Sequence, residues 1–128
     1  MTVHIVRLGS PRGSGEGLRI GTVRRPPRGV PKAEFASQDW YDIWYPELSP
    51  SAELVKLGQE AQSDKDWQLF RKRFRAEMAE PACTRTLDLL AALSRQTDFA
   101  VGCYCEDEAR CHRSVLRELL QEKGAEVV

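Results

Sequence analysis

Apolar residues recur at two different spacings along this chain, and the spacing separates strands from helices. Alternation over residues 2–8 predicts an opening strand, and residues 18–23 predict a second one that Pro26 and Pro27 end. The aromatic density over residues 39–45 is typical of a short strand or a packed loop. The continuously apolar run at 99–103 predicts a buried strand.

Four further segments show the period of three to four residues that is typical of helices. They are expected over residues 50–59, 64–79, 82–95 and 108–123. In the clearest of them, an apolar stripe is formed by Trp67, Phe70, Phe74 and Met78. Ser49 is expected to cap the first helix and Ser63 or Asp64 the second, while Pro81 can open the third. Gly124 stands where a C-terminal cap glycine belongs.

Strands at both ends of the chain, separated by helices, predict an α/β fold with a mainly parallel sheet. We expect residues 1–128 to form a single, three-layer-like domain with flanking helices. A hydrophobic fraction of 41% and a charged fraction of 30% are those of a soluble globular protein. No apolar run has the length of a membrane span or of a signal peptide, so we expect a cytoplasmic protein without a membrane partner. Its four cysteines are then expected to be thiols or ligands rather than disulfides.

The net charge is zero, but the charge is unevenly distributed. The first 32 residues contain one acid, Glu16, and seven basic residues: Arg7, Arg12, Arg19, Arg24, Arg25, Arg28 and Lys32. Such a segment could bind phosphates, including those of a nucleic acid. Pairing of these arginines with acids elsewhere in the fold is the favoured interpretation, because the whole chain is neutral.

Chemically versatile residues are concentrated in one short segment. Three cysteines, one histidine and two arginines fall within residues 103–113: Cys103, Cys105, Arg110, Cys111, His112 and Arg113. The segment joins the predicted strand at 99–103 to the predicted helix at 108–123. Open α/β sheets place their ligands at this position, beyond the carboxyl ends of the strands. His112 heads the apolar, core-facing stripe of the helix.

Two covalent or metal chemistries fit parts of this segment. Cys105 and Arg110 have the spacing of a sulfurtransferase loop, but the three acids between them would raise the thiol pKa and repel an anion. The catalytic candidates are Cys105, Cys111 and His112. The set Cys103, Cys105, Cys111 and His112 suits zinc, although it lacks a C-x-x-C knuckle and adjacent Cys and His rarely reach one ion. We therefore expect no cofactor, and the metal site stays a weak candidate.

The favoured function uses no covalent bond. Arg110, His112 and Arg113, together with Arg28 from the N-terminal segment, would hold a phosphate or carboxylate at the start of the last helix. His112 could act there as an acid or base near neutral pH. The competing interpretation is structural, with the cysteines packing as small hydrophobes and Glu106 or Asp107 capping the helix. Whether the protein is an enzyme, and whether it forms an oligomer, stays open.

Segments in four parts of the chain resemble a family of small uncharacterised bacterial proteins, domain-of-unknown-function family 488 (DUF488). The C-x-C…C-H-R segment with residues 114–120, the turn at 28–30, the segment 44–51 and the central helix around Trp67 carry the resemblance. The resemblance implies a compact α/β domain and singles out motif positions: Arg24 or Arg25, Arg28, Glu47, Ser51, Cys105, Cys111, His112 and Arg113. An aspartate and a tryptophan expected in the first turn are replaced here by Val23 and Pro26.

Together these observations predict a polar Cys/His/Arg pocket that binds a small phosphorylated or carboxylated ligand. One alternative is a nucleic-acid or protein-interaction module that uses the basic N-terminal segment. The other is a thiol-dependent redox or sulfur-transfer enzyme.

Overall fold

The computed structural model describes residues 1–128 and contains one four-stranded sheet in which every strand pair is parallel. The strands are β1 (Val3–Arg7), β2 (Leu18–Gly21), β3 (Ile43–Trp44) and β4 (Phe99–Cys103), arranged in the order β1-β4-β2-β3. Because β4 lies between β1 and β2, its five residues are all buried. The carboxyl ends of the strands therefore meet at one edge of the sheet, as the predicted parallel fold requires.

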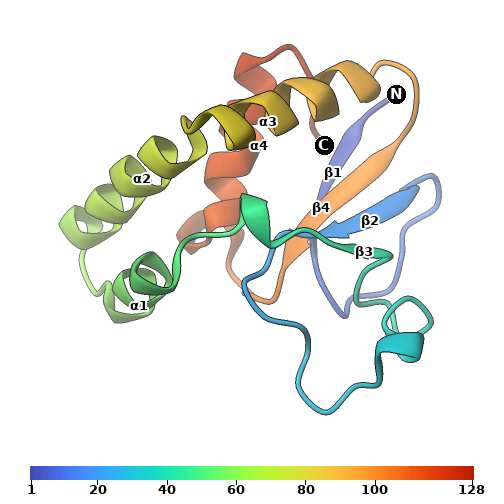
Figure 1. Ribbon diagram of the computed structural model, residues 1–128, viewed down its shortest axis with the longest axis horizontal. Helices are drawn as coiled ribbons and strands as arrows, with labels where there is room; N and C mark the ends of the chain where they lie inside the picture. The colour runs from blue at the N-terminus through green and yellow to red at the C-terminus, as the bar shows by residue number, and fades with distance from the viewer.

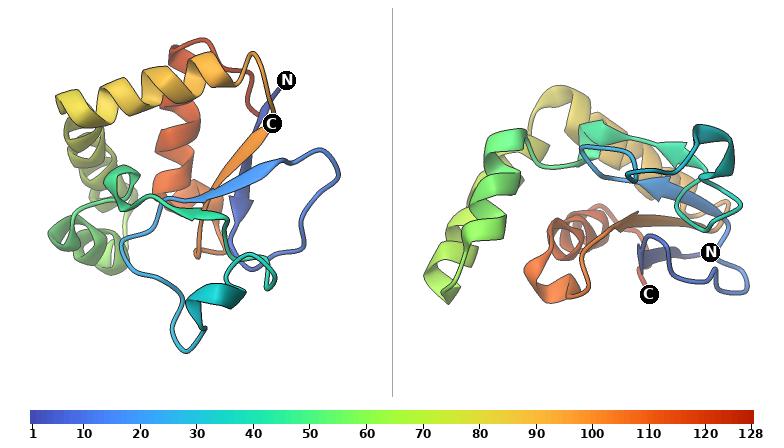
Figure 2. Two further views of the ribbon diagram at one scale, coloured as in Figure 1. Left: turned by 45° about the vertical axis from the view of Figure 1, so that its right-hand side comes forward. Right: turned by 90° about the horizontal axis from the view of Figure 1, so that it is seen from below.

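Four helices pack together beside this sheet (Figures 1 and 2). They are α1 (Ala52–Glu60), α2 (Asp64–Met78), α3 (Pro81–Leu93) and α4 (His112–Glu122). The first three form the long connection from β3 to β4, and α4 follows β4 directly. The fold class is thus the predicted single α/β domain. None of the helices is both long and apolar enough to cross a membrane.

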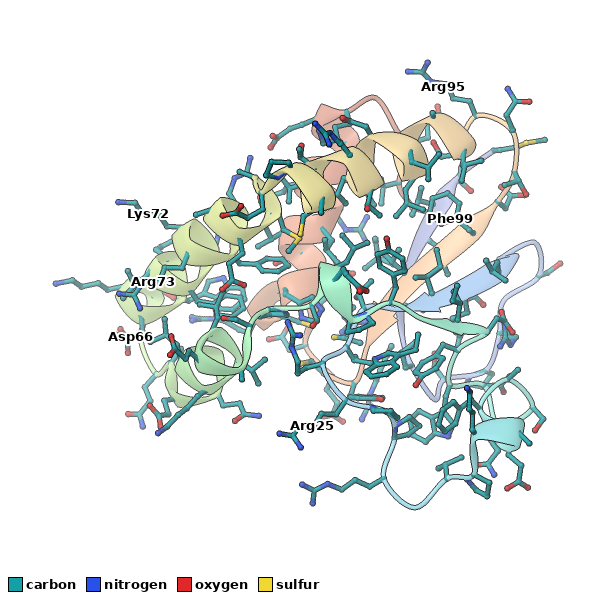
Figure 3. The ribbon with its side chains drawn as sticks, viewed as in Figure 1. Arg25, Asp66, Lys72, Arg73, Arg95 and Phe99 are labelled. Carbon is teal, nitrogen blue, oxygen red and sulfur yellow. The ribbon has the colours of Figure 1, made fainter.

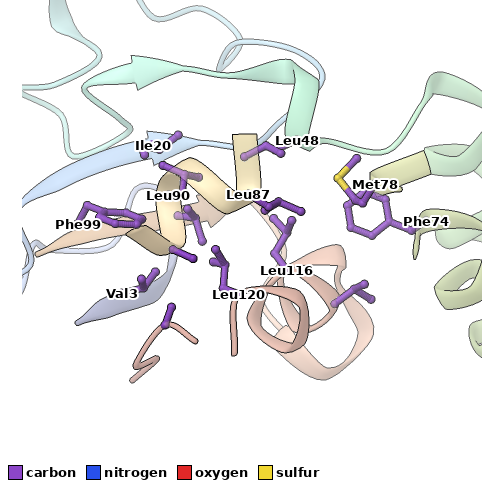
Figure 4. Close-up of a cluster of buried hydrophobic side chains, with 14 of the residues drawn as sticks. Val3, Ile20, Leu48, Phe74, Met78, Leu87, Leu90, Phe99, Leu116 and Leu120 are labelled. Atoms are coloured by element: carbon purple, nitrogen blue, oxygen red, sulfur yellow. The ribbon is translucent and has the colours of Figure 1, made fainter. Parts of the chain in front are cut away.

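The main core lies between the helices and one face of the sheet (Figure 4). Val3, Ile20 and Phe99 point to this face because side chains on a strand alternate. Helix residues meet them there at helical spacing: Phe74, Met78, Leu87, Leu90, Leu116 and Leu120. The stripe predicted on α2 is confirmed, since all four of its apolar residues are buried.

Loops, rather than helices, cover the opposite face. Tyr41 lies over Gly21, where an added Cβ would come within 2.3 Å of its ring. Fully buried Arg19 forms an ion pair of 2.8 Å with Glu16 on the same face. The segment 8–17 contains four glycines and one proline, too many for a long helix, and the segment 31–42 forms only a 3₁₀ turn, Lys32–Glu34, so this layer is irregular.

Two predicted helix starts differ from the structure. Ser49 ends a short 3₁₀ turn, Pro46–Leu48, and α1 begins later with Ser51 as its N-cap, accepting a hydrogen bond from the Leu54 N–H at 3.3 Å. The last helix breaks into a 3₁₀ turn, Glu108–Arg110, and then α4, because Cys111 is extended.

Other predicted boundaries agree with the structure. Ser63 caps α2 through its hydroxyl, and Pro81 is the first residue of α3. Gly124 follows α4 with a φ of +94°, in the left-handed region that a C-terminal cap requires. Val127 then pairs with Val3 as an isolated parallel bridge.

Candidate functional site

The cysteine-rich segment lies at the predicted edge of the sheet, where β4 ends at Cys103 and α4 begins at His112. Its residues come together in space around these two points. The sulfur atoms of Cys103 and Cys111 and a ring nitrogen of His112 all lie within 4.8 Å of one another. All three residues are buried, and we call them, with Cys105, the cysteine cluster.

The Cys105 thiol is the exposed member of the cluster. Hydrogen bonding with Cys103 and Cys111 lowers the pKa of the Cys105 thiol far below its usual value, and the positive charge of Arg113 acts in the same direction. The same contacts and burial raise the pKa of Cys103. For Cys111, the bond with Cys103 lowers the pKa, but the bond with Cys105 and burial raise it to about 11. Negative charge in the cluster is therefore favoured on Cys105.

The imidazole of His112 is fixed in one tautomer. Its Nε2 lies 2.6 Å from the carbonyl oxygen of Thr22, which can only accept, so Nε2 carries the proton. Nδ1 is left as an acceptor, 3.7 Å from the sulfur of Cys111. Burial lowers the pKa of His112 to about 4, so the ring is neutral at pH 7. This differs from the expected acid or base titrating near neutral pH.

Arg113 is a buried cation beside the cluster, with 3% of its surface exposed. Its Nη2 donates to the carbonyl oxygen of Cys105 at 2.6 Å. Its Nε has no hydrogen-bond partner, and no carboxylate lies within ion-pair distance of the guanidinium. A buried charge without an anionic partner is costly, so the nearby sulfurs are its natural counter-charge.

The three acids between Cys105 and Arg110 turn away from the cluster. Glu106 lies 3.5 Å from Arg7, and Asp107 accepts the Ala109 N–H at 3.0 Å to cap the 3₁₀ turn. Glu108 forms a 2.7 Å ion pair with Arg117. Two of the three carboxylates are thus paired with arginines, and none of the three lines the groove described below.

Arg110 also turns away from the cysteines. Its Nη2 lies 2.5 Å from a carboxylate oxygen of Asp64, and its guanidinium sits 6.0 Å from the ring centre of Trp67. The sulfurtransferase-type arrangement, in which this arginine would face the Cys105 sulfur, is therefore not formed.

A large groove opens in front of the cluster, with a volume of about 1540 Å³. It is bounded by the loop after β2, by α1 and the start of α2, and by the cysteine-rich segment. Six cationic side chains line it, and no carboxylate does: Arg7, Arg24, Arg25, Arg28, Lys56 and Arg110. We call it the basic groove. Figure 3 labels Arg25, whose side chain extends from the loop after β2 on the side of α1.

The basic N-terminal residues divide into paired and unpaired groups. Arg12 lies 2.8 Å from Asp42, and Arg19 is paired with Glu16, as the favoured interpretation predicted for such arginines. Arg24 donates to the carbonyl oxygen of Pro50. Three side chains in the groove have no protein partner: Arg25, Arg28 and Lys56.

Sequence reasoning missed two residues of this region. Thr22 orients His112 through its backbone, which leaves no signal in the sequence. Lys56 lines the groove because it lies on the face of α1 that points there. The orientation of that face depends on how α1 packs, which the sequence alone does not reveal. Ser51, a motif position, has a structural role instead: its hydroxyl donates to Glu77 at 2.6 Å.

Fold and site together define a small α/β protein with a buried Cys/His/Arg cluster at the carboxyl edge of a parallel sheet. The profile of the family described as the "Active DUF488-N3 subclade" matches residues 3–124, so the chain belongs to the DUF488 family. This confirms the resemblance seen in the sequence. No curated protein and no solved structure matches the chain.

Proposed function

We propose that the protein binds a small phosphorylated or carboxylated ligand in the basic groove. The observation that carries this proposal is the composition of the groove wall, with six cations and no carboxylate. Arg25 and Arg28 stand free of protein partners, so their guanidinium groups can each donate two parallel hydrogen bonds to an anionic group. Lys56 adds a third free charge from α1.

The groove also favours a ligand larger than a simple anion. Its volume of about 1540 Å³ exceeds the several hundred Å³ of ordinary small-molecule sites. Val23, Val55 and Phe70 supply an apolar wall for the carbon part of such a ligand. The matched subclade is described as active, which supports an enzymatic role for the groove.

Calorimetric titration with inorganic pyrophosphate and with citrate tests the proposal. We expect one of these probes to bind, and we expect Arg25→Ser/Arg28→Ser to weaken that binding about tenfold or more, since each 1.4 kcal/mol lost is a factor of ten. The matched control is Lys72→Ser/Arg73→Ser, which removes the same charge from the exposed side of α2, away from the groove (Figure 3). Equal affinity in both double variants, or no binding of either probe, would overturn the proposal.

Random-sequence DNA serves as a competitor in the same titrations. A nucleic-acid module would bind it more tightly than either probe, with an affinity that falls steeply as salt increases. We expect DNA to bind more weakly than the small anions, because Arg12 and Arg19 are already paired within the protein.

A further inference from the structure

The cysteine cluster brings two buried thiols and an imidazole together at the inner end of the basic groove, and the exposed thiol of Cys105 lines the same groove. A set of two or three thiols and an imidazole is the donor set that zinc selects in proteins. From the sequence alone, zinc binding by these residues was a weak candidate, because neighbouring residues such as Cys111 and His112 rarely coordinate the same ion. The structure removes that difficulty: Cys111 is extended, with φ −133° and ψ 150°, whereas His112 is the first helical residue. This change of backbone turns both side chains to the same side.

The distances fit a tetrahedral ion. Zinc–sulfur and zinc–nitrogen bonds of about 2.3 and 2.0–2.1 Å place the two ligand atoms about 3.6 Å apart. The sulfur of Cys111 lies 3.7 Å from Nδ1 of His112. The sulfur of Cys103 completes a triangle in which all separations are within 4.8 Å. The thiol of Cys105 is exposed and lines the same groove, so it is the candidate for the fourth corner.

The surroundings have the character of an outer ligand shell. His112 donates its other ring N–H to the Thr22 carbonyl at 2.6 Å, which leaves Nδ1 free to coordinate. Thr22 is itself held, since its hydroxyl donates to the Gly102 carbonyl at 2.9 Å. Nearly all metal-binding histidines are oriented by such a second hydrogen bond.

The buried charge of Arg113 is a second, independent indication that the cluster binds a cation. The complex of a divalent ion with three thiolates has a net charge of −1, and the buried guanidinium of Arg113 has a charge of +1. Its Nε–H has no hydrogen-bond acceptor, and metal-bound thiolates beside it would be strong acceptors. The charge balance thus closes once the sulfurs bind a cation.

We propose that Cys103, Cys105, Cys111 and His112 form a binding site for a single zinc-class divalent cation. Cys103, Cys111 and His112 anchor the ion from buried positions, and Cys105 closes the site from the groove. Metal binding releases the protons of the three thiols to solvent and needs no oxidant. The ion would bind whether or not the groove holds an anion.

Metal content and cobalt substitution of the full-length protein test this assignment. Zinc is measured by mass spectrometry after purification under reducing conditions without a metal-affinity step, and its affinity by competition with a chromogenic chelator. We expect one zinc per chain. Co²⁺ should give the visible bands of a tetrahedral ion and the near-ultraviolet band of cobalt–thiolate bonds. No stoichiometric binding, or an octahedral cobalt spectrum, would overturn the proposal.

Two variants and one control locate the ligands. Cys111→Ser should lower zinc affinity by about a hundredfold or more, given that outer-shell changes alone cost 10–100-fold. Cys105→Ser changes an exposed side chain and should leave the fold intact, while weakening zinc binding and the thiolate band. Cys83→Ser, at a half-buried thiol on α3 outside the cluster, should change neither. Unchanged affinity in Cys105→Ser would remove that residue from the site, and unchanged affinity in Cys111→Ser would exclude the site itself.

Discussion

At the scale of single residues, the site is organised by buried polar groups whose partners are unusually few. His112 has one strong partner, the Thr22 carbonyl, and two weaker ones, the Thr22 hydroxyl and the Cys111 sulfur. Arg113 has only the Cys105 carbonyl. In most proteins a buried arginine is matched by a carboxylate. Here the counter-charge must come from sulfur, and this makes the charge state of the cluster measurable through Arg113.

Replacing Arg113 with methionine distinguishes charged from neutral sulfur. If the cluster carries negative charge, Arg113→Met should lower the free energy of unfolding by about 2–3 kcal/mol, because a buried anion and the Cys105 carbonyl lose their partner. Urea unfolding under reducing conditions measures this. Arg117→Met is the control, because its pair with Glu108 is partly exposed and should be worth less than about 1 kcal/mol. An unchanged or more stable Arg113→Met protein would mean that the sulfurs are neutral thiols.

At the scale of elements, one side chain links the start of α1 to the end of α2. Ser51 caps α1 and also binds Glu77 near the end of α2, through its hydroxyl at 2.6 Å and its N–H at 2.9 Å. The cap therefore does two things: it starts a helix and fixes that helix against its neighbour. Because α1 forms one wall of the basic groove, this contact also sets the position of Lys56.

Ser51→Ala should remove the cap and the hydroxyl's hydrogen bond to Glu77, while the backbone N–H of residue 51 keeps its bond to Glu77. We expect a loss of about 2–3 kcal/mol in the free energy of unfolding, the sum of a cap worth about 1 kcal/mol and a charge-assisted hydrogen bond. Ser63→Ala removes a cap alone, at the start of α2, and should cost about 1 kcal/mol. Chemical denaturation of both variants measures the difference. Equal losses would mean that the contact with Glu77 contributes nothing.

The elements themselves were largely predictable from sequence, because hydrophobic period is a local property. The strand at Phe99–Cys103 and the stripe on α2 needed only their own residues. What could not be predicted depends on partners distant in the chain. Arg110 leaves the cysteines because Asp64 is available, 46 residues away. The cap of α1 falls on Ser51, where Glu77 is within reach. The edge of the sheet that carries the site was predictable, whereas the orientation of each charged side chain was not.

At the scale of the whole molecule, the two faces of the sheet are built by different means. Apolar packing against helices covers one face (Figure 4), whereas loops cover the other with a smaller apolar cluster around Tyr41 and with ion pairs. On the loop face, Asp42 ties the segment before β3 to two others: it accepts from Arg12 at 2.8 Å and from the Arg19 backbone N–H at 2.8 Å. The stability of this layer should therefore respond to pH.

Asp42→Asn tests that response. Partial burial raises the pKa of Asp42, but the hydrogen bonds from Arg12 and the Arg19 N–H outweigh it, so the net pKa is lowered. A carboxyl whose folded pKa lies below its unfolded value, about 3.9, stabilises the fold above that value and loses this effect as pH falls through the folded pKa. Asp42→Asn should then cost about 1–2 kcal/mol at pH 7 and much less below about pH 3. Urea titrations at both pH values measure this, with Asp88→Asn as the control, since Asp88 is 60% exposed and pairs with Lys123 at the surface. If Asp42→Asn lowered the free energy of unfolding equally at both pH values, the contribution of Asp42 would come from its packing and not from its charge.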